Sequence, residues 1–284
     1  MHAPATAEHA PAKINLALHV TGRRADGYHL LESLAVFTEL GDRITVAPAA
    51  EDNFSVTGPF AAHVPPDGDN LVMRARDALR ALAPGAAAPV AITLEKNLPI
   101  ASGIGGGSSD AAATLRALAR LWRIDADLAA PGLELGADVP MCLAARSLVA
   151  RGIGEALEEV ALPPLPLVLV NPGVAVATPD VFRALTSREN PPLPPLPAGI
   201  DAGGLASWLR TARNDLEAPA KALAPAISDV LDGLNGSGAL VARMSGSGAT
   251  CFGLFDSTDA AARSADALRR DRPGWFVAAT ASMR

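Results

Sequence analysis

The sequence predicts an α/β (α+β) protein of two domains, and three observations support this prediction. The chain has 284 residues, which is enough for two domains of ordinary size. Strand-like and helix-like segments are mixed along its whole length. After Pro166 the pattern restarts with a buried strand and continues as helices, strand, strand, helix and strand, the order of a ferredoxin-like split βαβ unit. We therefore expect a first domain over residues 1–160 and a second over 161–284.

The elements of the first domain follow from alternation and from capping signals. Alternating apolar residues predict strands at 11–22, 42–49, 53–58, 90–99, 147–155 and 156–162. Helical periodicity predicts helices at 69–83, at 109–123 and near 126–136. The first of these helices has Asp69 or Asn70 as its N-cap. Its apolar stripe consists of Leu71, Ala75, Ala78, Leu79 and Leu82.

The second domain is expected to contain one long irregular segment. Its strands and helices are predicted at 166–173, 178–185, around 204–223, 225–234, within 238–256, 257–270 and 275–281. The stretch "NPPLPPLPAG" at 190–199 carries five prolines in ten residues, so it must be an extended loop.

Composition excludes several classes of protein. A net charge of −6 argues against general binding to nucleic acid or to an anionic membrane. The first residues lack a basic region followed by an apolar one, so no secretory signal is predicted. Cys142 and Cys251 stand in apolar surroundings and outside any metal-binding spacing, which predicts two core residues. We expect a cytoplasmic enzyme or binding protein.

The tract "ASGIGGGSSD" at 101–110 enters a helix directly. Glycines before a helix N-terminus leave backbone N–H groups free to point at an anion, and the helix dipole adds positive potential. This arrangement predicts a phosphate cradle, with Ser108 and Ser109 as N-cap or phosphate donors. A branched side chain at Gly106 is expected to block the phosphate. The tract fits neither the P-loop nor the Rossmann pattern, and a protein-kinase glycine loop lies between strands instead.

Three motifs together resemble the GHMP kinases, a superfamily of small-molecule kinases. They are "PAKINLAL" at 11–18, "LPIASGIGGGSSDAAATL" at 98–115 and "MSGSGATCFGLF" at 244–255, and they stand in the order of the family. The resemblance implies two α/β domains with the active site in the cleft between them, and it implies ATP with Mg²⁺. Ala101 and Ser102 depart from the family, in which glycines are common at these positions.

Two further stretches, "DGYHLLESL" and "LGADVPMCL", resemble one branch of the superfamily. That branch phosphorylates the 2-hydroxyl of a methylerythritol carrying cytidine diphosphate, in the non-mevalonate route to isoprenoid precursors. The rival interpretations are a homoserine or mevalonate-type kinase and a catalytically silent ATP-binding regulator. The resemblance implies a small-molecule substrate, and we expect a monomer or weak homodimer.

The resemblance also implies roles for individual residues. Only three of the 24 basic residues are lysine, which makes each lysine notable. Lys13 is expected to be a catalytic cation and Asp138 the base that accepts the proton of the hydroxyl. Tyr28 and Phe182 are expected to sandwich the cytosine, with His29, in the loop after the first strand, at its polar edge. Asn15 and Thr178 complete the substrate positions.

The ATP-binding positions form one run with a lysine before it. They are Lys96, Pro99, Ile100, Ala101, Ser102, Gly103, Ile104, Gly105, Gly106, Gly107, Ser108 and Ser109. Whether Lys96 meets adenine, ribose or phosphate stays open. Asp110 is interpreted as a cap of the helix start. The "SGSG" stretch at 245–248 is either a support for the substrate phosphates or a hairpin turn, and no metal ligands are assigned.

Overall fold

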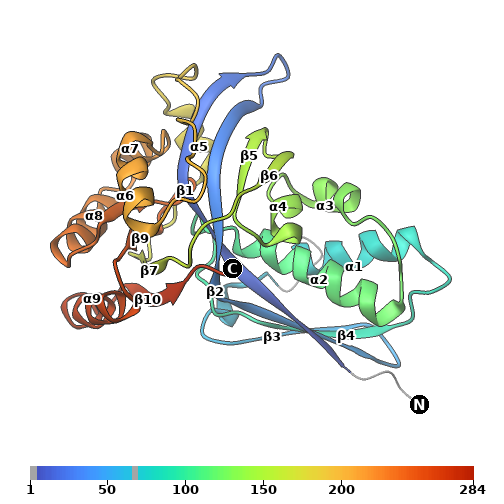
Figure 1. Cartoon of the computed structure of the whole chain (residues 1–284). Coiled ribbons are helices and arrows are strands. Elements are labelled where there is room, and N and C mark those ends of the chain that lie inside the picture. Colours follow the sequence, from blue (N-terminus) through green and yellow to red (C-terminus); the bar gives the residue numbers. More distant parts are fainter. Residues whose placement is uncertain (1–4, 66–69) are drawn as a thin grey trace. The chain divides into compact units, whose positions relative to one another are not determined.

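The computed structural model describes residues 5–65 and 70–284 (Figure 1). Contacts between Cα atoms divide the chain into two compact units. Unit 1 contains the described residues of Met1–Ala12, Gly41–Ile100 and Gly105–Ala145, and unit 2 contains Lys13–Leu40, Ala101–Ile104 and Arg146–Arg284. The units are interleaved in sequence because two long strands, β1 (Thr6–Arg23) and β2 (His29–Pro48), contribute residues to both. A domain boundary near residue 160 therefore remains a prediction.

Unit 1 combines strands with helices packed on them. Residues 43–48 of β2 pair antiparallel with β4 (Val90–Glu95), and β4 pairs in parallel with β3 (Asn53–Thr57). The helical elements are η1 (Ala61–His63), α1 (Leu71–Leu82), α2 (Gly106–Trp122), α3 (Ala129–Leu135) and α4 (Val139–Ala144). Figure 1 shows α1 and α2 side by side over β3 and β4. Alanines dominate the buried face of α2, which lets neighbouring helices approach it closely.

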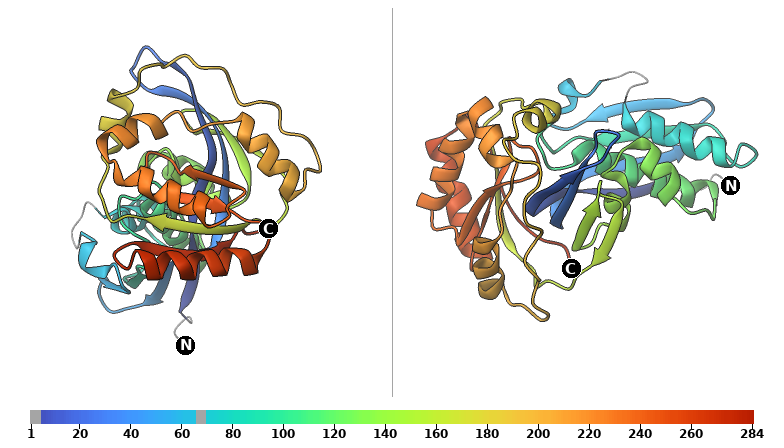
Figure 2. Two further views of the ribbon diagram at one scale, coloured as in Figure 1. Left: turned by 90° about the vertical axis from the view of Figure 1, so that its left-hand side faces the viewer. Right: turned by 90° about the horizontal axis from the view of Figure 1, so that it is seen from above.

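Unit 2 contains the ferredoxin-like order that the sequence predicts. Its four-stranded sheet has the order β10-β7-β9-β8, antiparallel throughout, and α8 and α9 pack on one face (Figure 2). The elements are β7 (Pro166–Asn171), α5 (Thr178–Arg183), α6 (Ala202–Thr211), α7 (Glu217–Leu223), α8 (Ala226–Gly236), β8 (Val241–Met244), β9 (Cys251–Leu254), α9 (Thr258–Asp271) and β10 (Phe276–Ala281). In addition, β5 (Leu148–Gly152) pairs with residues 31–35 of β2 and with β6 (Ala156–Glu159).

Several boundaries differ from the sequence prediction. Strand β2 begins at His29, thirteen residues before the predicted strand, because the pairing of residues 31–35 with β5 extends it. Helix α1 buries Val72, Ala75 and Leu79, whereas Leu82 of the predicted stripe is 52% exposed. The helical stretch predicted at 204–223 is broken between α6 and α7. Helix α4 was not predicted.

Smaller predictions can be compared directly. Asn70 caps α1, since its side chain accepts a hydrogen bond from the backbone N–H of Val72, and Asp69 lies outside the described residues. Cys142 and Cys251 are buried free thiols, as predicted. Residues 190–199 contain no helix or strand, as the prolines predict. Within residues 5–65 and 70–284, no helix is long and apolar enough to cross a bilayer.

Candidate active site

The first half of the glycine tract, Ala101–Ile104, belongs to unit 2 and is bonded there to the two other motifs. The backbone N–H of Lys13 donates to the Ile104 carbonyl at 2.9 Å. The N–H of Thr250 donates to the Ser102 carbonyl at 3.0 Å, and the Ser245 hydroxyl donates to the Gly103 carbonyl at 3.1 Å. Main-chain bonds thus assemble the three motifs that lie far apart in the sequence.

Gly103 is the residue that permits this assembly. A Cβ there would lie 2.6 Å from the carbonyl oxygen of Ser245 and 2.7 Å from both the N and O atoms of Gly248, distances that real Cβ atoms essentially never show. Its φ of +77° is also in the left-handed region that favours glycine. The turn at 245–248 is therefore packed against the glycine tract.

The second half of the tract starts α2 in unit 1. Gly105 is the N-cap, with φ of +64°, and it has no side chain with which to cap the helix. The serines therefore do not cap: Ser108 and Ser109 are the third and fourth residues of the helix. The first three N–H groups, from Gly106 to Ser108, have no acceptor within the helix. Among the described residues the buried Ser109 hydroxyl also lacks a partner.

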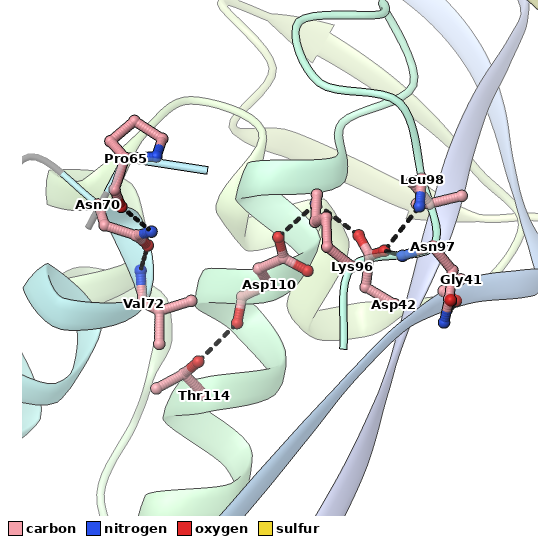
Figure 3. Close-up of polar contacts among 10 residues, drawn as sticks. All are labelled: Gly41, Asp42, Pro65, Asn70, Val72, Lys96, Asn97, Leu98, Asp110 and Thr114. Carbon is pink, nitrogen blue, oxygen red and sulfur yellow. Dashed lines mark hydrogen bonds and ion pairs between the residues drawn. The ribbon is translucent and has the colours of Figure 1, made fainter. Parts of the chain in front are cut away.

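Lys96 does not reach towards a nucleotide as a free cation. Its Nζ atom donates to Asp42 Oδ2 at 2.5 Å and to Asp110 Oδ2 at 2.6 Å, and all three side chains are buried (Figure 3). Asp110 therefore binds Lys96 instead of capping α2. Burial raises the pKa of the Asp110 carboxyl to about 7, although the Lys96 ammonium opposes this shift. The attractions of both carboxylates raise the pKa of Lys96 despite its burial.

Gly106 faces this cluster, and the side chains of Lys96 and Asp42 are its close neighbours. A Cβ on Gly106 would lie 3.2 Å from Lys96 Nζ and 3.8 Å from Asp42 Oδ2. A side chain at this position would therefore meet the lysine, and the expectation that a branched side chain would block the phosphate stays a prediction. Pro99 and Ile100 connect this region to the rest of the tract, and Ile100 is 37% exposed.

Two predicted residues lie on buried positions of β1. Lys13 is 5% exposed, so it is not a solvated surface lysine. Asn15 is fixed by its neighbours: its N–H donates to the Ser245 hydroxyl, and its side-chain amide donates to the Ser33 hydroxyl at 2.7 Å. The Asn15 Oδ1 atom is buried and has no hydrogen-bond partner in the part of the chain that the structure describes. That oxygen is an unsatisfied acceptor in the interior.

The predicted base-binding residues form a group in unit 2 with an unexpected pairing. His29 is the first residue of β2 and does not lie in a loop. Its ring stacks on Phe182, with centroids 4.6 Å apart and an interplanar angle of 27°. Tyr28 is 59% exposed, and the Thr178 hydroxyl lies 2.7 Å from that of Ser247.

His29 has one ring nitrogen whose hydrogen-bonding capacity is unused among the described residues. Its buried Nε2 atom has no hydrogen-bond partner within the described ranges. Burial, together with the charges of Arg23 and Arg188, lowers its pKa, which favours the neutral ring. A neutral imidazole can donate at one nitrogen and accept at the other, as the edge of a heterocyclic base requires.

Asp138 is placed at the start of α4 in unit 1. It occupies the N-cap position with φ of −84°, but its side chain makes no capping hydrogen bond there. The expected role of Asp138 as the base stays a prediction. No cluster of three or more His, Cys, Asp or Glu side chains suited to a metal ion occurs in the residues that the structure describes.

Sequence reasoning missed two groups of the site. They are Asp42, which binds Lys96, and the Ser33 hydroxyl, which accepts a hydrogen bond from the Asn15 side chain. Asp42 stands 54 positions before Lys96, and no local pattern connects the two. Ser245 belongs to the 245–248 stretch that the sequence singled out, and its hydroxyl donates to the Gly103 carbonyl.

Family models match both halves of the chain. "GHMP kinases N terminal domain" matches residues 70–146, and "GHMP kinases C terminal" matches residues 198–273. Together they cover more than half of the sequence. The chain belongs to the GHMP kinases. In this GHMP kinase the N-terminal match includes the glycine tract and Asp138, and the C-terminal match includes the 245–248 turn.

Individual relatives agree with this assignment. A 4-diphosphocytidyl-2-C-methyl-D-erythritol kinase of Mesorhizobium japonicum is 62% identical, over 97% of this chain and 95% of its own length. A crystal structure of 4-(cytidine 5'-diphospho)-2C-methyl-D-erythritol kinase has a TM-score of 0.80 and 38% identity, covering 98% of this chain and 100% of that chain. A homoserine kinase from Cytophaga hutchinsonii shares the fold, with a TM-score of 0.70 at 20% identity, over 98% of this chain and 94% of its own.

Proposed function

We propose that this kinase transfers a phosphoryl group from ATP to the 2-hydroxyl of 4-diphosphocytidyl-2-C-methyl-D-erythritol, giving the 2-phosphate and ADP. This reaction belongs to non-mevalonate isoprenoid precursor biosynthesis. The observation that carries the proposal is the 62% identity to a kinase of that name over 97% of the chain. The 20% identity to a homoserine kinase, over nearly the same length, supports only a common fold.

The phosphates of ATP are assigned to the start of α2. The N–H groups of Gly106, Gly107 and Ser108 have no acceptor within the helix, and the helix dipole adds positive potential at that end. Residues 99–104 lead into this turn. The unpartnered Ser109 hydroxyl, with that of Ser108, would hold Mg²⁺ together with the phosphate oxygens. When bound, the ion supplies positive charge that neutralises the phosphate oxygens.

Lys13 and Asp138 are assigned the chemistry at the acceptor hydroxyl. Asp138 accepts the proton as the phosphoryl group arrives, and Lys13 stabilises the negative charge that develops on the oxygens. The burial of Lys13 supports this role, because an ammonium in surroundings of low dielectric interacts strongly with an anion.

The cytosine is assigned to the group around Phe182. Tyr28 offers an exposed ring for stacking, and the unpartnered His29 Nε2 can read the polar edge of the base. Since His29 already stacks on Phe182, a sandwich between Tyr28 and Phe182 requires the imidazole to move or the base to stack beyond it. Asn15 Oδ1 and the Thr178 hydroxyl are polar groups for the remainder of the substrate.

The test is ADP release, coupled to a reporter enzyme, with the cytidine diphosphate substrate, homoserine and mevalonate supplied in parallel. Activity with the first substrate only is expected. The matched variant Asp138→Asn keeps the size of the side chain and should lower turnover by about 10²–10⁴-fold, with little change in substrate binding. Preference for homoserine or mevalonate would refute the substrate assignment, and ATP binding without any turnover would favour a silent regulator.

We further propose that the enzyme acts in the cytoplasm as a monomer or weak homodimer, without nucleic-acid partners. The net charge of −6 supports the last point, because nucleic-acid binding favours a basic surface. Sedimentation velocity over a range of concentrations tests the oligomeric state.

A further inference from the structure

The buried cluster of Asp42, Lys96 and Asp110 connects three elements of unit 1. Asp42 lies in β2, Lys96 follows the last residue of β4, and Asp110 is in the second turn of α2 (Figure 3). Two carboxylates share one ammonium, so full ionisation leaves a net negative charge in the interior. Buried charges of this kind add little net stability, because desolvation offsets their attraction. We therefore expect the cluster to act by fixing the relative positions of the three elements that it connects.

The cluster also holds the chain that leads into the glycine tract. Asp42 Oδ1 accepts hydrogen bonds from the backbone N–H groups of Asn97 at 2.6 Å and Leu98 at 2.8 Å. The opposite oxygen binds the Lys96 ammonium. One carboxylate therefore orients both the end of β4 and the lysine that reaches α2.

The ammonium contacts α2 at Asp110 and lies close to the first residue of the helix. Asp110 in the second turn accepts its hydrogen bond, and a Cβ added to Gly106 in the first turn would lie 3.2 Å from Nζ. A hydrogen-bonded charge is directional, whereas an apolar contact would let the helix slide or rotate. The cluster thus fixes the position of the residues whose N–H groups have no intrahelical acceptor.

We propose that Lys96, held between Asp42 and Asp110, is a positioning residue that aims the first N–H groups of α2 at the phosphates of ATP. Lys96 acts through the helix and does not itself bind the nucleotide. The inference rests on the proposed function, since it takes ATP as the ligand of this turn.

Asp110 offers the cleanest variants. Asp110→Ala cuts the link to α2 but leaves a balanced Lys96–Asp42 pair, so no unpaired charge is buried. Asp110→Asn keeps the shape and an acceptor oxygen for Nζ. We expect Asp110→Ala to raise the dissociation constant of ATP about tenfold. Removing a residue that orients a binding group, without touching the ligand, typically costs at least this much affinity. Asp110→Asn should stay within about twofold of the wild type.

Three further readouts separate positioning from general stability. In Asp110→Ala, kcat at saturating ATP and the KM of the acceptor substrate should remain near wild type. Hydrogen exchange of the amides of residues 109–111, which donate within the first turns of α2, should accelerate. Arg80→Met is the matched control: it removes a bidentate pair with Asp52, at 2.6 and 2.9 Å, close to the other end of α2. It should lower the melting temperature without weakening ATP binding.

The outcomes are distinct. Wild-type ATP affinity in a folded Asp110→Ala variant would overturn the positioning role alone. Equal weakening in Arg80→Met would also overturn it, since the effect would then follow stability. A wild-type chain that binds no ATP would overturn both this inference and the proposed function. Weaker ATP binding in Asp110→Ala, restored in Asp110→Asn, supports the inference.

Discussion

Gly103 and Gly106 stand three residues apart in one tract, yet a Cβ would meet different neighbours at the two positions. At Gly103 it would strike backbone atoms of Ser245 and Gly248 within 2.7 Å, and φ is +77°. At Gly106 it would meet the end of the Lys96 side chain at 3.2 Å. The first glycine thus serves main-chain packing inside unit 2, and the second leaves room for a charged group in unit 1. Glycines of one tract can thus serve close backbone packing at one position and the placement of a charged group at another.

The largest effect is expected from Gly103→Ala. Left-handed strain and overpacking against backbone should together lower the free energy of unfolding by about 2–5 kcal/mol. Urea denaturation measures this change. Gly246→Ala probes the same contact from the opposite side, because a Cβ there would lie 2.7 Å from the Gly103 carbonyl oxygen. The double variant should lose less than the sum of the two single losses. Additive losses would show that the contact does not link the two motifs.

The two units also differ in their buried polar groups. Unit 1 buries the charged cluster of Asp42, Lys96 and Asp110, whereas unit 2 buries the neutral side chain of His19. His19 is fully buried; Nδ1 lies 3.0 Å from the Pro191 carbonyl oxygen, and Nε2 accepts from the Arg213 N–H. Burial lowers its pKa below 6.5. The unfolded chain therefore binds a proton first as the pH falls.

The sign of the resulting pH dependence follows. Stability is fully present above pH 6.5 and is lost below it, by up to about 1.4 kcal/mol per pH unit. We expect wild type to lose more stability than His19→Gln between pH 7 and pH 5.5, measured by denaturant titration. Parallel pH profiles of the two proteins would contradict a neutral, buried His19.

Gly106→Ala should have a smaller effect on stability than Gly103→Ala. The added methyl must displace an ammonium held by two carboxylates, which should cost about 1 kcal/mol after the helix propensity of alanine is included. Gly107→Ala is the control, since its Cβ would lie 3.4 Å from the movable Leu71 side chain. Thermal unfolding ranks the two variants. If both variants lost the same amount of stability, the nearby Lys96 ammonium would not be the reason that Gly106 resists a side chain.

The smallest effect is expected from Ala101→Gly, at a position where this chain departs from the glycines common in the family. Ala101 has φ of +50°, a left-handed conformation that is unfavourable for alanine. Glycine relieves that strain but adds freedom to the unfolded chain, so the net gain should be about 0.5 kcal/mol. Calorimetry that found a clear loss of stability would show that the Ala101 side chain makes a favourable contact.

Much of the fold was predictable because its signals are local. Apolar periodicity and turn residues predicted α2, α9 and the ferredoxin-like order of unit 2. Proline density predicted the irregular segment at 190–199. Local signals failed where a distant partner decides the structure. The first part of β2 is a strand because residues 31–35 pair with β5, more than a hundred positions away. Helix α7 is separate from α6 partly because Asn214, between them, bonds the carbonyls of Met244 and Gly246.

The same division holds for the site. From the sequence alone, the three motifs and the glycine-rich start of a helix could be recognised, because both depend on residues that are neighbours in the chain. Only the tertiary structure decided that Gly103 packs on the 245–248 turn, that Lys96 is held by Asp42 and Asp110, and that His29 stacks on Phe182. Each of these contacts joins side chains or backbone from separate elements. Their geometry follows from strand pairing and packing, which no local pattern encodes.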